Sequence, residues 1–188
     1  MTTSEHDDDA RAWTLAGFLV TCEAARAERA AVLPETILSA SSCVCPRQPI
    51  FDEPFASYAA AARAAPPSSR VLAVGLRGPD IEAILDEVDA TGLESPMTAR
   101  LRSRPTFAAP GAEFEGYELV SWRGGLEHSW LCIGLEAHAF FELGITPGPF
   151  GLLTSLADAD ALAALVHEGK VVSEPGLWMV ARVGVIEP

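Results

Sequence analysis

The order of hydrophobic patterns after residue 70 most constrains how this chain can fold. The segment RVLAVGL (70–76) predicts a short strand. The next segment, GPDIEAILDEVDATG, predicts a helix that places its apolar residues on one face and ends at Gly92. GYELVSWRGGLEHSWLCIG predicts a hairpin that turns at Gly124–Gly125.

The C-terminal part of the chain continues this alternation. We expect a short helix over 135–143, a helix that begins at Ser155 and runs to His167, and a final strand over 176–187. Apart from the short inserted helix, the order is strand, helix, strand, strand, helix, strand. This order predicts an α+β fold, a ferredoxin-like βαββαβ sandwich over residues ~70–188.

The N-terminal part is expected to be helical. Apolar residues from Trp13 onward recur at steps of three and four, and FDEPFASYAAAARAA predicts a second helix with Asp52 as a cap. PPSS (66–69) is the clearest linker. We therefore expect an N-terminal helical segment, 1–65, packed on a main α+β domain, 70–188. Three prolines in 94–113 predict a long irregular connection.

Charge narrows the choice of partners. The 188 residues carry 13 basic and 26 acidic side chains, a net charge of −13, and the one dense basic cluster is Arg100, Arg102 and Arg104. This balance argues against nucleic acid and favours a protein partner, most simply a basic one. The apolar run WTLAGFLV follows acidic residues and is too short to span a bilayer. We expect a cytoplasmic protein without a membrane partner.

Four residues are candidate metal ligands. His128 and Cys132 share a side of the segment whether it is a strand extended to residue 133 or a helix, and Cys43 and Cys45 could complete the set from a distant loop. The competing interpretation is a packed histidine and a buried cysteine beside Trp130. A chain of this length folds without a metal, so we expect no cofactor, with zinc as the alternative.

The same stretch offers candidates for thiol chemistry. Cys132 could be activated by His128 or His138, because a neighbouring imidazole lowers the pKa of a thiol. Cys43 and Cys45 lie in a loop rich in serine and proline, where redox cysteines are often found. By contrast, Glu113, Glu115 and Glu118 are expected to form a solvated edge.

Three functions are compatible with these patterns. The first is a non-enzymatic accessory module of the immunity or regulatory type, which binds a protein through its acidic surface. The second is an enzyme or sensor that uses thiol or zinc chemistry at Cys132 and His128 with the Cys43–Cys45 loop. The third is a module that binds a small ligand on an open sheet face.

Overall fold

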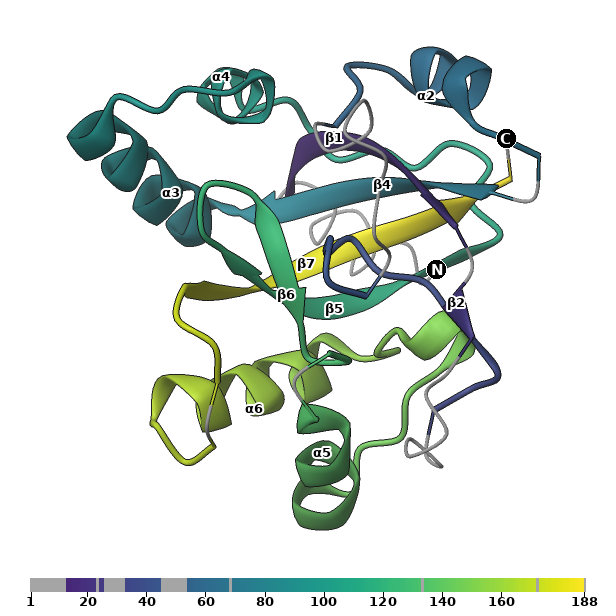
Figure 1. The fold of residues 1–188 in the computed structure, drawn as a ribbon, viewed down its shortest axis with the longest axis vertical. Coiled ribbons are helices and arrows are strands. Elements are labelled where there is room, and N and C mark those ends of the chain that lie inside the picture. The colour runs from purple at the N-terminus through teal and green to yellow at the C-terminus, as the bar shows by residue number, and fades with distance from the viewer. Residues whose placement is uncertain are drawn as a thin grey trace, which may run out of the picture.

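A computed structural model gives the fold of this chain (Figure 1). It describes residues 13–22, 24–25, 33–44, 54–67, 69–132, 134–171 and 173–187. For residues 22, 24 and 25 it describes the backbone alone.

A five-stranded antiparallel sheet forms the centre of the molecule. Its strand order is β1-β4-β7-β5-β6, and every neighbouring pair is antiparallel. The strands are β1 (Trp13–Cys22), β4 (Ser69–Arg77), β5 (Phe114–Trp122), β6 (Leu126–Ser129) and β7 (Leu177–Ile186). A separate two-stranded ladder pairs β2 (Ala24–Ala25) with β3 (Thr36–Ile37).

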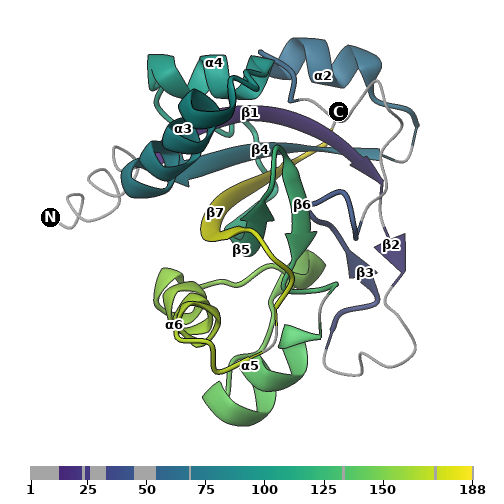
Figure 2. The same cartoon turned by 60° about the vertical axis from the view of Figure 1, so that its left-hand side comes forward.

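Helices lie at both ends of the molecule. In Figures 1 and 2, α2, α3 and α4 lie at one end and α5 and α6 at the other. The helices are α2 (Tyr58–Ala64), α3 (Gly78–Thr91), α4 (Pro96–Ser103), α5 (Leu135–Leu143) and α6 (Leu156–His167), with a short 3₁₀ turn, η2 (Pro149–Gly151).

The central strands are buried on both faces. In β7, Trp178 and Val180 belong to one hydrophobic core, and the alternating residues Met179 and Ala181 belong to the other. Helix α6 packs into the first core and α3 into the second. Because successive strand residues point to opposite faces, these two helices cover opposite sides of the sheet.

The predicted fold class is confirmed as α+β with an antiparallel sheet, but the ferredoxin-like topology is not confirmed. Such a sandwich has its helices on one face of the sheet, whereas α3 and α6 contribute to different cores. The last strand, β7, also lies between β4 and β5. The sequence pattern predicted most of the elements after residue 70, but it carries no information on which strands become neighbours.

The helix predicted from Trp13 onward is wrong, because this segment forms strand β1 and pairs with β4 in the main sheet. Its apolar run is buried on both faces, and such a run resembles a buried helix when periodicity alone is considered. The second predicted helix exists as α2, where Ser57 is the N-cap. The expected cap, Asp52, lies outside the described residues.

The connection over 94–113 is more ordered than expected. It contains α4, and Ser95 and Thr98 form a reciprocal capping box at its start. The prolines suggested a loop, but Pro96 occupies the first turn of the helix, where a proline is tolerated. The hairpin at Gly124–Gly125 is confirmed, as are α3, α5, α6 and β7 near their predicted bounds.

Candidate functional site

The segment that carries Cys43 runs along the edge of the main sheet. The backbone N–H of Ser42 donates to the carbonyl of Leu126 at 3.0 Å, and the N–H of Cys43 donates to the carbonyl of Glu127 at 3.0 Å. Both acceptors are in β6, the edge strand. Backbone hydrogen bonds therefore hold Cys43 beside the hairpin, although more than eighty residues separate them in the sequence.

A tight turn after β6 positions Cys132. The N–H of Cys132 donates to the carbonyl of Ser129 at 3.0 Å, and the N–H of Leu131 donates to the Ser129 hydroxyl at 3.1 Å. Between them, the Trp130 side chain is fully buried in the core and anchors the turn. Cys132 itself is exposed and His128 is half-buried, so packing in the core does not account for this pair.

Cys43, Cys132 and His128 come together at this point, and we call them the cysteine–histidine site. A disulfide links Cys43 and Cys132, whose Cα atoms are 6.5 Å apart, within the range that disulfides adopt. The Cys132 sulfur lies 3.8 Å from His128 Nδ1. One ligand atom from each of the three residues lies within 4.8 Å of the others.

The structure therefore groups three of the four residues predicted as metal ligands. Cys45 lies outside the described residues. His138, a second predicted partner of Cys132, lies on α5, where its Nδ1 is 2.6 Å from Glu142 Oε1. The route to the grouping also differs from the expected one, because β6 ends at Ser129 and the following turn brings His128 and Cys132 together.

Two kinds of chemistry are open to such a group. A cysteine pair can cycle between a disulfide and a dithiol, and a neighbouring imidazole favours the reactive thiolate. In the dithiol form, two thiolates and an imidazole are also donor types that zinc accepts. Zinc bonds of about 2.0–2.3 Å require neighbouring ligand atoms at separations comparable to the 3.8 Å between Cys132 and His128.

Glu118 was assigned to a solvated edge, and this assignment is wrong. Its side chain is fully buried, and it accepts hydrogen bonds from the Ala40 N–H, at 2.8 Å, and from the Ser39 hydroxyl. Within β5, Glu118 has the same parity as Val120 and Trp122, which are core residues. Strand alternation could therefore have predicted its burial, whereas its hydrogen-bond partners come from a segment that is distant in sequence.

A half-buried carboxyl group, that of Glu136, lies in the first turn of α5. Burial raises the pKa of Glu136 above its ordinary value, while a hydrogen bond from its own backbone and the neighbouring His138 oppose this shift. Glu136 Oε2 is buried without a hydrogen-bond partner among the described residues. Desolvation is therefore the largest cost of placing this carboxylate here, and it is offset only in part.

The arginine cluster that bears on nucleic-acid binding is engaged in contacts within the protein. Arg100 donates to the carbonyl of Phe55, Arg102 pairs with Asp89 and Glu94, and Arg104 pairs with Glu82.

The third predicted function, binding of a small ligand on the sheet, needs an open sheet face. Across the described residues, both faces of the central strands are covered by the two cores.

No protein-family model, curated protein or solved structure gives a significant match to this chain. Among the described residues, none of the helices has both the length and the apolar character needed to cross a bilayer.

Proposed function

We propose that this chain is a thiol-based redox sensor whose switch is the Cys43–Cys132 disulfide. The observation that carries the proposal is the pairing itself, in which two exposed cysteines 89 positions apart meet beside a histidine. Exposed disulfides are the ones that small thiols reach and reduce most readily, and they are commonly regulatory. The sequence favours the cytoplasm, where a disulfide is usually transient and redox-sensing.

His128 gives the switch its chemical asymmetry. Its Nδ1 lies next to the Cys132 sulfur, so an imidazole can accept the thiol proton or stabilise the thiolate. Cys132 is therefore the more nucleophilic thiol of the reduced pair. Reduction removes the covalent link between Cys43 and the turn that precedes α5, while the backbone hydrogen bonds to β6 remain, and this is the change that a partner could detect.

The first experiment measures the reactivity of Cys132. We expect His128→Ala to slow the alkylation of Cys132 in reduced protein at neutral pH by about tenfold, because the thiolate fraction falls with the loss of the imidazole. His138→Ala is the matched control, since His138 pairs with Glu142. Equal rates in wild type and His128→Ala would refute the assigned role of His128.

The second experiment separates the redox switch from a metal site. We expect protein isolated without reductant to yield a peptide that links Cys43 to Cys132, and a small thiol to open that link reversibly. Stoichiometric zinc that is lost in Cys132→Ser would instead assign the site to metal binding. Elemental analysis of untagged protein and mapping of disulfide-linked peptides distinguish the two outcomes.

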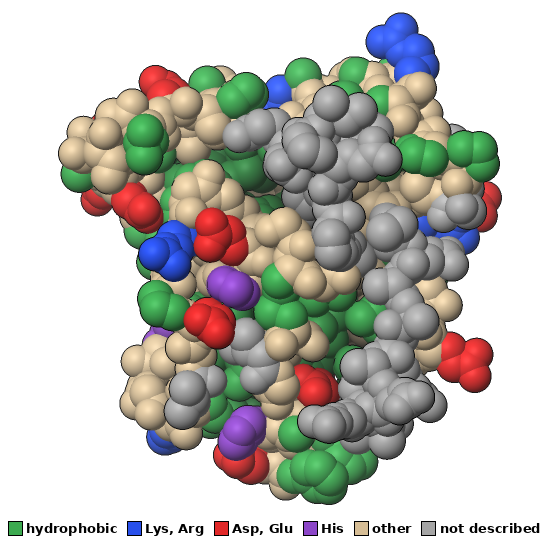
Figure 3. Space-filling model, in the orientation of Figure 1, with side chains coloured by type: hydrophobic (Ala, Val, Ile, Leu, Met, Phe, Trp, Pro, Cys, Tyr) green, Lys and Arg blue, Asp and Glu red, His purple; other side chains and the backbone are tan. Residues whose placement is uncertain are grey.

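The second candidate function is the accessory protein-binding module, and the exposed end of α5 favours it. Phe141 is 78% exposed, and Phe140 and Leu143 are partly exposed beside it. Figure 3 shows hydrophobic side chains gathered at the lower end of the molecule, over α5. Aromatic side chains are enriched in interface cores, and the net charge of −13 favours a basic partner.

A pair of variants tests this second function. Phe141→Glu should weaken the binding of a partner by about tenfold or more, because interface aromatics carry much of the binding energy. Leu93→Glu, at an equally exposed apolar position just after α3, should leave the binding unchanged. Calorimetry with the purified partner at two salt concentrations measures both effects. Equal losses of affinity in the two variants would show that α5 is not the binding surface.

A further inference from the structure

A buried carboxyl group lies at the far end of a hydrogen-bond chain that reaches the redox pair. Glu118 lies on a face of β5 that otherwise enters the apolar core, and burying a carboxylate costs free energy unless donors satisfy it. Two donors come from a single segment: the Ala40 N–H binds Oε2 at 2.8 Å, and the Ser39 hydroxyl binds Oε1. This segment continues directly to Cys43.

The chain runs through two buried serines. Ser39 Oγ lies 2.7 Å from Ser41 Oγ, and the Ser41 N–H also donates to Ser39 Oγ at 2.9 Å. Ser41 Oγ lies 3.5 Å from the Cys43 sulfur. Ser39 and Ser41 are both fully buried, whereas Cys43 is exposed. A continuous polar path therefore leads from the interior carboxylate to the surface sulfur.

With Glu118 ionised, the number of available hydrogens gives the direction of this chain. An ionised carboxylate only accepts hydrogen bonds, and each serine hydroxyl has one hydrogen to donate. The Ser39 hydrogen therefore points to Glu118 and the Ser41 hydrogen points to Ser39. This leaves the Ser41 oxygen as an acceptor that faces Cys43. A thiol can donate to it, but a disulfide sulfur has no hydrogen.

We propose that Glu118, acting through Ser39 and Ser41, biases the Cys43–Cys132 pair towards its dithiol form. This inference rests on the proposed redox function and assigns Glu118 as a positioning residue for it. In the reaction, two molecules of a low-molecular-weight thiol supply two electrons and two protons. The protein S–S bond breaks, both cysteines become thiols, and the two small thiols form their own disulfide. The Cys43 thiol then completes the chain.

The variant Glu118→Gln reverses the chain. The amide carbonyl takes the Ala40 N–H, so the amide NH₂ donates to Ser39, Ser39 donates to Ser41, and Ser41 donates to the sulfur. A sulfur atom accepts weakly in both redox states, so the preference for the dithiol is lost. One hydrogen bond of ordinary strength corresponds to about two- to tenfold in the equilibrium constant, and we expect Glu118→Gln to shift it by that factor towards the disulfide.

The test measures the equilibrium of the pair with reduced and oxidised glutathione, in full-length protein that carries Cys45→Ser to simplify the peptides. Mass spectrometry of alkylated peptides gives the reduced fraction of the Cys43–Cys132 pair. Ser41→Ala should shift the equilibrium towards the disulfide as Glu118→Gln does, because it removes the acceptor of the thiol hydrogen. Adding Glu118→Gln to Ser41→Ala should have no further effect. Ser42→Ala is the control, since Ser42 Oγ donates to the Glu127 carbonyl, outside the chain.

Two outcomes would overturn the inference while leaving the redox function intact. One is an equal thiol–disulfide equilibrium constant of the Cys43–Cys132 pair in Ser41→Ala and in Ser42→Ala. The other is a Glu118→Gln effect that persists in full without Ser41. If Glu118→Gln does not fold, the comparison of Ser41→Ala with Ser42→Ala decides alone. Failure of the pair to form a disulfide at any glutathione ratio would refute the proposed function, and the inference with it.

Discussion

At the scale of single residues, the two cysteines of the cysteine–histidine site have different neighbours, one at the surface and one that leads into the interior. His128 lies against the Cys132 sulfur, while the serine chain connects Cys43 to Glu118. The two sulfurs thus have different polar neighbours, although they form one disulfide. We expect the two thiols of the reduced protein to differ in reactivity, with Cys132 the faster one because of its imidazole neighbour.

The carboxyl group of Glu136 makes stability depend on pH. Because burial raises its pKa, the folded protein keeps this proton at pH values where the unfolded chain has lost it. Stability therefore falls as pH rises through the window above the ordinary glutamate pKa. In Glu136→Gln the group cannot ionise, and we expect this part of the fall to disappear.

Urea unfolding at steps between about pH 4 and about pH 6 measures this effect, since an ordinary glutamate titrates near the lower limit. Glu87→Gln, on the exposed side of α3, controls for the loss of one surface carboxylate. Identical pH dependence in wild type and Glu136→Gln would contradict the assignment of a buried, destabilised carboxylate.

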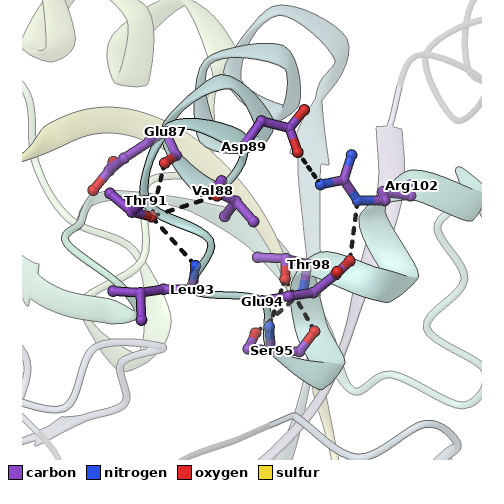
Figure 4. Close-up of polar contacts among 9 residues, drawn as sticks. All are labelled: Glu87, Val88, Asp89, Thr91, Leu93, Glu94, Ser95, Thr98 and Arg102. Atoms are coloured by element: carbon purple, nitrogen blue, oxygen red, sulfur yellow. Dashed lines mark hydrogen bonds and ion pairs between the residues drawn. The ribbon is translucent and has the colours of Figure 1, made fainter.

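At the scale of elements, the junction of α3 and α4 shows how a helix can begin within a proline-rich segment (Figure 4). The Ser95 hydroxyl accepts from the Thr98 N–H at 3.3 Å, and the Thr98 hydroxyl accepts from the Ser95 N–H at 2.8 Å. Arg102 then ties the helix to Asp89 and Glu94. The buried residues Met97 and Leu101 anchor α4 in the core that also holds α3.

Two variants separate the capping box from the ion pairs. Ser95→Ala should lower the free energy of unfolding by about 1 kcal/mol, because the Thr98 N–H loses its side-chain acceptor while the backbone N–H of residue 95 keeps the Thr98 hydroxyl. Arg102→Ala should have a smaller effect, since its exposed ion pairs are screened by water. Urea denaturation measures both variants, and a larger loss in Arg102→Ala would mean that the ion pairs position α4.

At the scale of the whole molecule, the disulfide joins two distant parts of the chain beside the edge of the main sheet. Cys43 precedes α2 and β4, whereas Cys132 follows the hairpin of β5 and β6. The intervening chain contains α2, α3, α4 and three strands of the main sheet. The disulfide therefore closes a loop that contains most of the elements of the fold, and it stabilises their folded arrangement.

Reduction should consequently lower the global stability. Closing a loop of 89 residues restricts the unfolded chain by about 4–5 kcal/mol in the chain-entropy model, which sets the upper limit of the loss. We expect a reductant to lower the free energy of unfolding of the wild type by a few kcal/mol. It should leave the double variant Cys43→Ser/Cys132→Ser unchanged. A reductant effect of the same size in the double variant would place its origin elsewhere.

The sequence by itself determined those elements whose signals are local. Helix α3 and its end at Gly92, the hairpin at Gly124–Gly125, and β7 follow from periodicity and turn residues within short windows, because these patterns act directly on backbone conformation. Cys132 and His128 do lie together, but a turn after β6 brings them together, and not the strand or helix spacing from which we expected it.

Only the tertiary structure decided how these elements meet. The run from Trp13 is apolar throughout, and its pairing with β4 made it a strand. The burial of Glu118, the contact of its carboxylate with Ser39 and the meeting of Cys43 with Cys132 all join residues about 80 or more positions apart. Such contacts depend on strand order and on which face of the sheet each segment covers, and local residue patterns do not encode either of these properties.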